Sequence, residues 1–360
     1  MSDISKDLKE QPTFSKDIGD KNQEHHSFEV KDKSILEKIQ HFLHGNPTMV
    51  PVFILVISVI AFGLVAGDKF FSAFNLSLII QQVTIVGILA AGQTLIILTA
   101  GIDLSIAAIM VLSSVFMGTI AVNLGFPTPL ALIVGFIGGA SCGALNGLLV
   151  TKVKLPPFIV TLGTWSIFFA LVIYFSGSQS IRARDIESNA PLLHFFGERI
   201  NIYGAVFTYG AFLMILIFIV LWFALNRTAW GRHVYAVGDD KEAAELSGIR
   251  TDRTLISVYT LAGVICAIGA WVSIGRVGSV SPTSFYEGNL DSITAVVIGG
   301  TSLFGGRGTI IGSLFGALIV GVFSSGLSIA GLDVLWQRFA LGCLIIIAVG
   351  IDQWIRKVSN

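Results

Sequence analysis

The feature that most constrains this chain is a succession of apolar runs of about 20 residues, separated by short polar segments. Between Asp103 and Lys152 the sequence contains no charged residue at all. A transmembrane helix needs about 20 mainly apolar residues, so runs of this length predict membrane spans. Of the 360 residues, 13% are charged and 53% hydrophobic, whereas soluble domains carry about 25% charged residues. The chain is therefore predicted to be an all-α, polytopic integral membrane protein.

The hydrophobic pattern predicts about ten transmembrane helices. We expect them at 50–67, 76–100, 104–123, 130–150, 157–175, 205–226, 254–275, 290–304, 309–330 and 335–352. The eighth is short and rich in glycine, which predicts a broken or re-entrant segment covered by protein or water. Its predicted hinge residues are Gly299, Gly300, Gly305, Gly306 and Arg307. Glycines four residues apart in 130–150 and 309–330 predict close helix packing, within one subunit by default.

Lysine and arginine placement predicts the orientation, because loops on the cytoplasmic side carry an excess of both residues. If both termini are cytoplasmic, the outer side keeps only Lys69, Arg182, Arg184, Arg199, Arg276 and Arg338. The segment 227–253 is then cytoplasmic, and 176–204 is external. Residues 1–48 form a polar cytoplasmic tail, and its end is predicted to be an amphipathic helix lying on membrane lipid. Residues 49–356 form the transmembrane domain.

The stretch "GRHVYAVGDDKEAAELSGIRTDR", residues 231–253, is the most charged part of the transmembrane domain. Asp239 or Asp240 can cap a short helix, and Gly248 can end it. The apolar part of that helix would be Ala243, Ala244, Leu246 and Ile249. The caps and apolar residues of this helix alone fit either an ordinary connector or a docking helix for a cytoplasmic partner. The external segment 176–204 combines paired charges with apolar residues, which suits docking of a soluble partner or an amphipathic helix on the membrane.

Several polar side chains within the predicted spans are candidates for lining a hydrophilic path. They are Gln81, Gln82, Gln93, Thr94, Asp103, Asn146, Thr161, Thr164 and Trp165. Polar groups are costly in lipid, so each should face either a water-filled path or a neighbouring helix. The sequence leaves both roles open for each of them. For Asp103, capping of the third span is favoured over a place in the path.

The sequence argues against several other functions. Its three cysteines each lie inside an apolar run, so we expect buried thiols with no metal site. A net charge of zero gives no indication of nucleic-acid binding. Outside the tail, His194 and His233 fall on opposite predicted sides of the membrane, which argues against an enzyme active site. A proton-coupled carrier commonly needs ionisable groups at mid-membrane, and the acidic residues here fall near predicted span ends.

Four stretches resemble the permeases of ribose/xylose/galactose-type monosaccharide ABC importers, and the resemblance covers residue 50 to the C-terminus. They are "LTAGIDLSIAAIMVLSS" (98–114), "NGLLVTKVKLPPFIVTLGTW" (146–165), "ITAVVIGGTSLFGGRGTIIGSLFGALIVGV" (293–322) and "DDKEAAELSGI" (239–249). The last is similar to the coupling-helix region of such permeases. "LNRTAWGRHVYAVGDD" and "IIIAVGIDQWIRKV" resemble most closely the fructose-import members.

The resemblance implies a permease subunit in the bacterial inner membrane that carries a monosaccharide inward. Fructose is the first expectation, and ribose or xylose is the alternative. It implies three partners: a cytoplasmic ABC ATPase, a periplasmic sugar-binding protein and a second permease copy in a homodimer. No cofactor is expected, and ATP hydrolysis would occur on the partner. The residues implied in coupling to the ATPase are Asp239, Glu242, Ala243, Ala244, Glu245, Ser247 and Gly248.

Overall fold

The computed structural model describes residues 49–356, so the predicted tail and its surface helix lie outside the described residues. The main apolar helices are α2 (Met49–Ala66), α4 (Ala73–Leu98), α5 (Ile106–Gly118), α6 (Thr128–Thr151), α7 (Pro157–Ser176), α9 (Tyr209–Arg227), α12 (Thr251–Val277), α13 (Gly288–Ile298), α14 (Ile310–Ile329) and α15 (Val334–Arg356). The π-helix Thr119–Asn123 continues α5. Short elements between them are α3 (Asp68–Phe71), α8 (Ala183–Asn189), the 3-10 helix Pro191–Gly197, β1 (Arg199–Ile202), β2 (Ala205–Thr208), α10 (Ala229–Asp239) and α11 (Lys241–Leu246).

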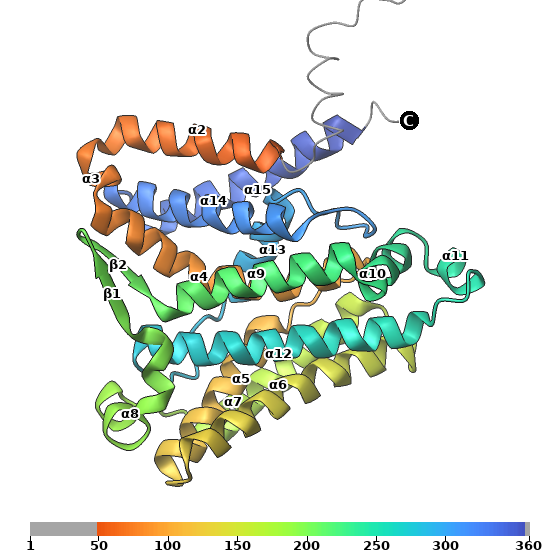
Figure 1. Cartoon of the computed structure of the whole chain (residues 1–360), viewed down its shortest axis with the longest axis horizontal. Helices are drawn as coiled ribbons and strands as arrows, with labels where there is room; N and C mark the ends of the chain where they lie inside the picture. Colours follow the sequence, from red (N-terminus) through yellow and green to blue (C-terminus); the bar gives the residue numbers. More distant parts are fainter. Residues whose placement is uncertain (1–48, 357–360) are drawn as a thin grey trace, which may run out of the picture. The chain divides into compact units, whose positions relative to one another are not determined.

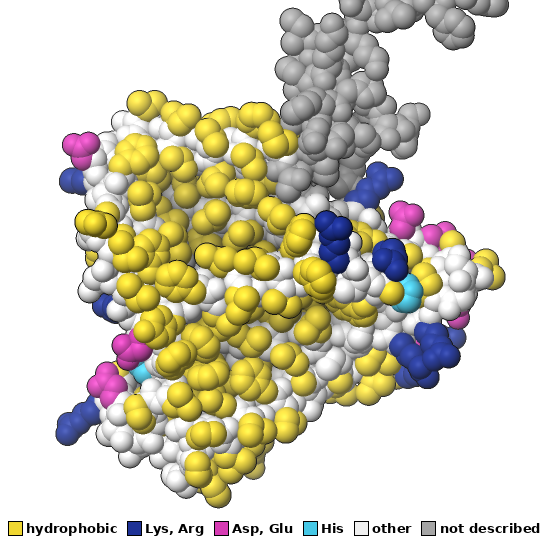
Figure 2. Space-filling model, viewed as in Figure 1, with side chains coloured by type: hydrophobic (Ala, Val, Ile, Leu, Met, Phe, Trp, Pro, Cys, Tyr) yellow, Lys and Arg dark blue, Asp and Glu magenta, His cyan; other side chains and the backbone are white. Residues whose placement is uncertain are grey.

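Eight helices in the described part of the chain are long and apolar enough to cross a membrane. Two shorter apolar helices, Gly288–Ile298 and Val334–Ile347, occupy the places of the eighth and tenth predicted spans. The expectation of a mainly helical, polytopic membrane protein is therefore confirmed, while the count of ten spans stays a prediction. Figure 2 shows hydrophobic side chains covering the middle of one face, with charged side chains gathered toward its two ends. This distribution fits a surface surrounded by lipid.

The long helices run between two ends of the bundle. One end carries α10 and α11, and the other carries α8 and the β1–β2 hairpin (Figure 1). We call these the α11 end and the hairpin end. The hairpin pairs Arg199 with Thr208 and Ile202 with Ala205 in antiparallel register. It corrects the strictly all-α expectation, because residues 205–208 are a strand and not the start of a span.

Glycine contacts hold neighbouring helices of the bundle close together. In α6, a side chain at Gly143 would overlap the carbonyl of Tyr259 in α12. In α14, a side chain at Gly316 would overlap the carbonyl of Ala295 in α13. Helix backbones can approach this closely only where small residues face one another. The four-residue glycine spacing thus serves packing within one subunit, as predicted.

The α13 helix is too short to cross a membrane, and its start meets the start of α5 inside the bundle. The α13 helix has 11 residues, about 16 Å at 1.5 Å per residue, against a hydrocarbon core of about 30 Å. At its start, a side chain on Gly288 would lie 3.4 Å from Ala107 near the start of α5. The Asn289 amide also donates to the Leu104 carbonyl at 3.2 Å. The chain thus turns inside the protein before α5 and before α13.

Candidate functional site

The predicted coupling segment is built from two helices, where the sequence predicted one. Thr228 caps α10 by accepting from the Gly231 amide at 3.2 Å. Asp240 then caps α11, because its Oδ1 accepts from the amides of Glu242 and Ala243 at 2.9 Å each. Asp239 is instead the last residue of α10. Gly248 follows α11 with φ +85°, the left-handed conformation that glycine adopts without steric cost.

The α11 helix is anchored on one side and open on the other. Ala244 is buried against Val237 of α10 and Leu255 of α12. Leu246 points outward with 91% of its surface exposed. The other predicted coupling residues, Glu242, Ala243, Glu245, Ser247 and Gly248, are exposed as well. The segment therefore presents a capped helix with an apolar tip at the α11 end, while Ala244 attaches it to the bundle.

Contacts of α10 connect this segment to the glycine-rich turn that follows α13. The Tyr235 hydroxyl donates to the Gly308 carbonyl at 3.0 Å. Burial raises the pKa of the Tyr235 phenol, so the hydroxyl keeps the proton that it donates. Gly238 lies directly against the Leu98 carbonyl at the end of α4, and that carbonyl also accepts from the Gly306 amide at 3.0 Å. Helices α10 and α4 and the turn thus meet at one point.

The predicted hinge residues all lie in this turn, 299–309, between α13 and α14. Gly300, Gly305 and Gly306 have positive φ angles, so the chain there cannot continue as a helix. A side chain at Gly305 or Gly306 would collide with α10 or with the chain after α4. Arg307 is exposed, and its carbonyl accepts from the Ser302 amide at 2.9 Å. The turn closes the α11 end of the bundle beside the coupling segment.

Asp103 forms the centre of a buried polar network. Its Oδ1 accepts from the Ser105 amide at 2.6 Å and from the Ser105 hydroxyl at 2.7 Å. The Asn146 amide donates to Ser105 Oγ at 2.8 Å and to Asp103 Oδ2 at 3.4 Å. The Gln93 amide faces the Asp103 backbone and can bond both its N–H and its carbonyl. The N-cap of α5 is Ser105, so the expectation that Asp103 caps this span is wrong.

The remaining candidates for the path fall into two groups. Thr94, Thr161 and Thr164 are buried. Thr94 Oγ1 lies 2.7 Å from Ser313 Oγ, and Thr161 donates to the Ile102 carbonyl at 3.0 Å. Gln82 lines a cavity, whereas Trp165 packs edge-on against Tyr286 with ring centroids 5.5 Å apart. Whether any of them contacts a transported molecule stays a prediction.

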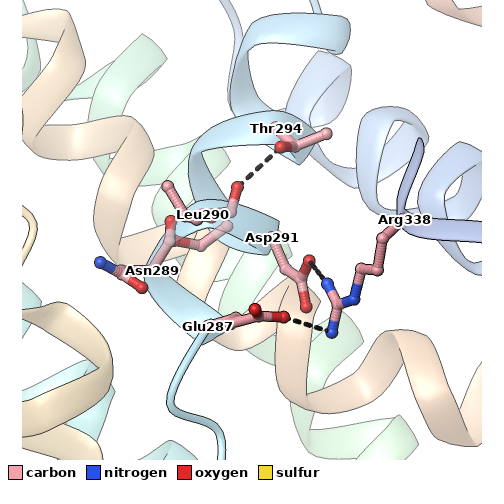
Figure 3. A network of polar contacts seen from close by, with 7 residues as sticks. Glu287, Asn289, Leu290, Asp291, Thr294 and Arg338 are labelled. Atoms are coloured by element: carbon pink, nitrogen blue, oxygen red, sulfur yellow. Dashed lines mark hydrogen bonds and ion pairs between the residues drawn. The ribbon is translucent and has the colours of Figure 1, made fainter. Parts of the chain in front are cut away.

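Sequence patterns did not identify as a site the cluster of ion pairs that lies at the start of α13. Arg338 of α15 contacts Glu287 at 2.8 Å and Asp291 at 3.0 Å, as Figure 3 shows. Asp291 lines a cavity together with Val320, which lies midway along the 20-residue α14. Asp291 and Arg338, which line this cavity together, therefore lie beside the middle of α14. Sequence patterns placed them near span ends because they could not show that α13 starts inside the protein.

The position of these charged side chains beside the middle of α14 limits which surroundings they can have. Arg338 and Glu287 are about half exposed within the subunit, and Asp291 is 27% exposed. An arginine or aspartate at the centre of a membrane helix costs about 2.5–3.5 kcal/mol on insertion scales unless protein or water surrounds it. We therefore expect this face of α13 and α15 to meet water or protein.

Comparison with known proteins identifies the family. Residues 75–349 match the family described as the branched-chain amino acid transport system permease component. The chain belongs to this permease family. The fructose import permease protein of Rhizobium meliloti is 59% identical over 346 residues, which cover 96% of each chain. The ribose import permease protein of Bacillus subtilis (strain 168) is 39% identical over 84% of this chain and 90% of its own.

A more distant relative is named for a different sugar. The xylose transport system permease protein of Escherichia coli (strain K12) is 30% identical over 86% of this chain and 93% of its own. No solved structure gives a significant match. The permease is thus similar to import proteins for several sugars, and it is a multi-pass protein of the bacterial inner membrane.

Proposed function

We propose that this permease is the membrane-spanning subunit of a binding-protein-dependent ABC importer for a monosaccharide, with fructose as the cargo. The observation that carries the cargo is the 59% identity to a fructose import permease across 96% of both chains. The ribose and xylose permeases are less similar. The amino acid named in the family's description is therefore a poorer guide to this member than its sugar-importing relatives are.

Coupling to a cytoplasmic ATPase is the second part of the proposal. The α11 end would face the cytoplasm, where α11 would enter a cleft of the ATPase with Leu246 as its apolar contact. Movement of α11 would pass through Ala244, which packs on Val237 of α10, and then to the turn at 299–309, because close backbone contacts join α10 to that turn. Small shifts can be amplified where packed contacts admit two discrete arrangements. The hairpin end would then receive the periplasmic sugar-binding protein.

A homodimer is the third part. The half-exposed ion pairs of α13 and α15 must meet water or protein and not lipid. A second copy facing this surface would enclose a water-filled path between the two subunits. The proposal thereby accounts for a polar surface at a depth where a monomer would expose it to acyl chains.

The test is a pull-down of the tagged permease from native membranes, combined with sugar uptake. The variant Leu246→Glu should lose the ATPase and ATP-driven fructose uptake, because it places a charge on the apolar tip. Leu124→Glu is the control, since Leu124 is also exposed but lies in the loop between the π-helix and α6. Recovery of the same ATPase with Leu246→Glu would contradict the docking assignment. Uptake that follows a proton gradient without ATP would instead support a secondary carrier using the buried Asp103 or the partly buried Asp291.

A further inference from the structure

The ion pairs at the start of α13 border the larger of two adjoining cavities. This cavity measures about 500 Å³ and is lined by Leu89, Phe285, Tyr286, Glu287 and Arg338, among others. Its volume falls within the range of pockets that hold small ligands, about 300–1,000 Å³. A second cavity of about 160 Å³ includes Gln82 and shares Asp291 and Arg338 with the first. The two cavities therefore meet at the charged cluster.

The lining combines two kinds of chemistry. Glu287 and Asp291 offer carboxylate oxygens, and Arg338 offers guanidinium N–H groups. Tyr286 also lines the cavity, and its ring packs against Trp165 and Phe169, with ring centroids 5.5 and 5.4 Å apart. Tyr286 is 52% exposed, so one surface of this aromatic group remains open. The cavity thus has charged hydrogen-bonding groups beside a flat apolar surface.

A neutral monosaccharide matches this combination. Its hydroxyl groups both donate and accept, so they can bond carboxylates and a guanidinium at the same time, and charge-assisted hydrogen bonds are the stronger ones. Its C–H faces are apolar and can lie on an aromatic ring.

We propose that Tyr286, Glu287, Asp291 and Arg338 form a transient monosaccharide-binding site halfway through the permease. The identity of the cargo rests on the proposed function, whereas the position of the site rests on the cavity, the charges and their depth. The site binds weakly, because a cargo in transit must enter and also leave. It gives the permease a selectivity of its own.

The test measures binding to the full-length permease in lipid nanodiscs, without the ATPase or the binding protein. Saturation-transfer NMR with D-fructose, D-ribose and L-leucine as separate probes detects millimolar binding. We expect a signal from D-fructose that Glu287→Gln and Tyr286→Ala each weaken at least tenfold in apparent affinity. The matched controls Asp68→Asn and Tyr174→Ala remove a charge and a ring outside the cavities, and they should bind like wild type.

The outcomes separate this site from the wider function. If wild type gives no sugar signal, or if every variant gives the same signal, the proposed site is wrong. The ion pairs then only hold α13 and α15 together. A variant-sensitive signal from L-leucine alone would overturn the assignment to sugars. If D-fructose or D-ribose binds wild type and binds Glu287→Gln and Tyr286→Ala more weakly, the site is supported. This holds even if ATP-driven uptake is absent and the ABC importer proposal is wrong. Glu287→Gln should unfold at the wild-type temperature, since Glu287 is half exposed.

Discussion

Gly238 lies where the coupling segment meets the core, and Gly238→Ala tests that junction. The added Cβ would overlap the Leu98 carbonyl and lie 2.7 Å from the Gly306 amide nitrogen. Both obstacles are backbone atoms, so neither can move aside as a flexible side chain would. The helix α10 must therefore shift away from α4 and from the turn, or those segments must shift instead.

The size of the effect follows from the contacts. Overpacking a closely fitted site costs about 1–3 kcal/mol. Weakening the Gly306-to-Leu98 hydrogen bond, 3.0 Å long, adds about 0.5–1.5 kcal/mol. Alanine recovers up to about 1 kcal/mol of helix propensity within α10. We expect a net loss of about 0.5–4.5 kcal/mol, and we expect ATP hydrolysis to continue with little sugar uptake.

Gly163→Ala is the matched control, because Gly163 also lies within a helix but a Cβ there meets nothing within 4 Å. Thermal unfolding of the purified permease measures the stability change in both variants. Proteoliposomes containing the ATPase and the binding protein report ATP hydrolysis and sugar uptake separately. If Gly238→Ala unfolds and transports like Gly163→Ala, the junction does not transmit movement and the reasoning is refuted.

Substitutions at three further residues test other parts of the molecule. Gly143→Val should destabilise the permease by about 1–3 kcal/mol, because it separates α6 from α12; an unfolding temperature equal to that of Gly163→Val would contradict this. Asp103→Asn should be mild, since it keeps the acceptor for Ser105, whereas Asp103→Ala leaves buried donors unpaired and should cost about 1–3 kcal/mol by the same assay. Gly248→Val should weaken ATPase recovery in the pull-down by straining a residue at φ +85°, with Gly248→Asn affected less; equal recovery with both would argue against the strain.

The local features of the chain could be predicted because they depend on neighbours in sequence. Apolar runs define the helices, since each run must satisfy its own backbone hydrogen bonds in lipid. The cap of α11 and the stop at Gly248 follow from residues a few positions apart. The glycine spacing of α6 predicted a close contact, although α12 as its partner emerged only from the structure.

The positions of the polar residues within the bundle, and the residues that they contact, could be seen only in the tertiary structure. The sequence placed Arg338 outside and Asp291 at a span end, because hydropathy treats each apolar segment as a full crossing. Only the folded chain shows α13 starting inside the bundle and Arg338 reaching it from α15. Likewise, Tyr235 and Gly238 carry no signal of their meeting with Gly308 and Leu98. The sequence alone determines which segments are helical and apolar, while long-range packing decides where polar groups come together.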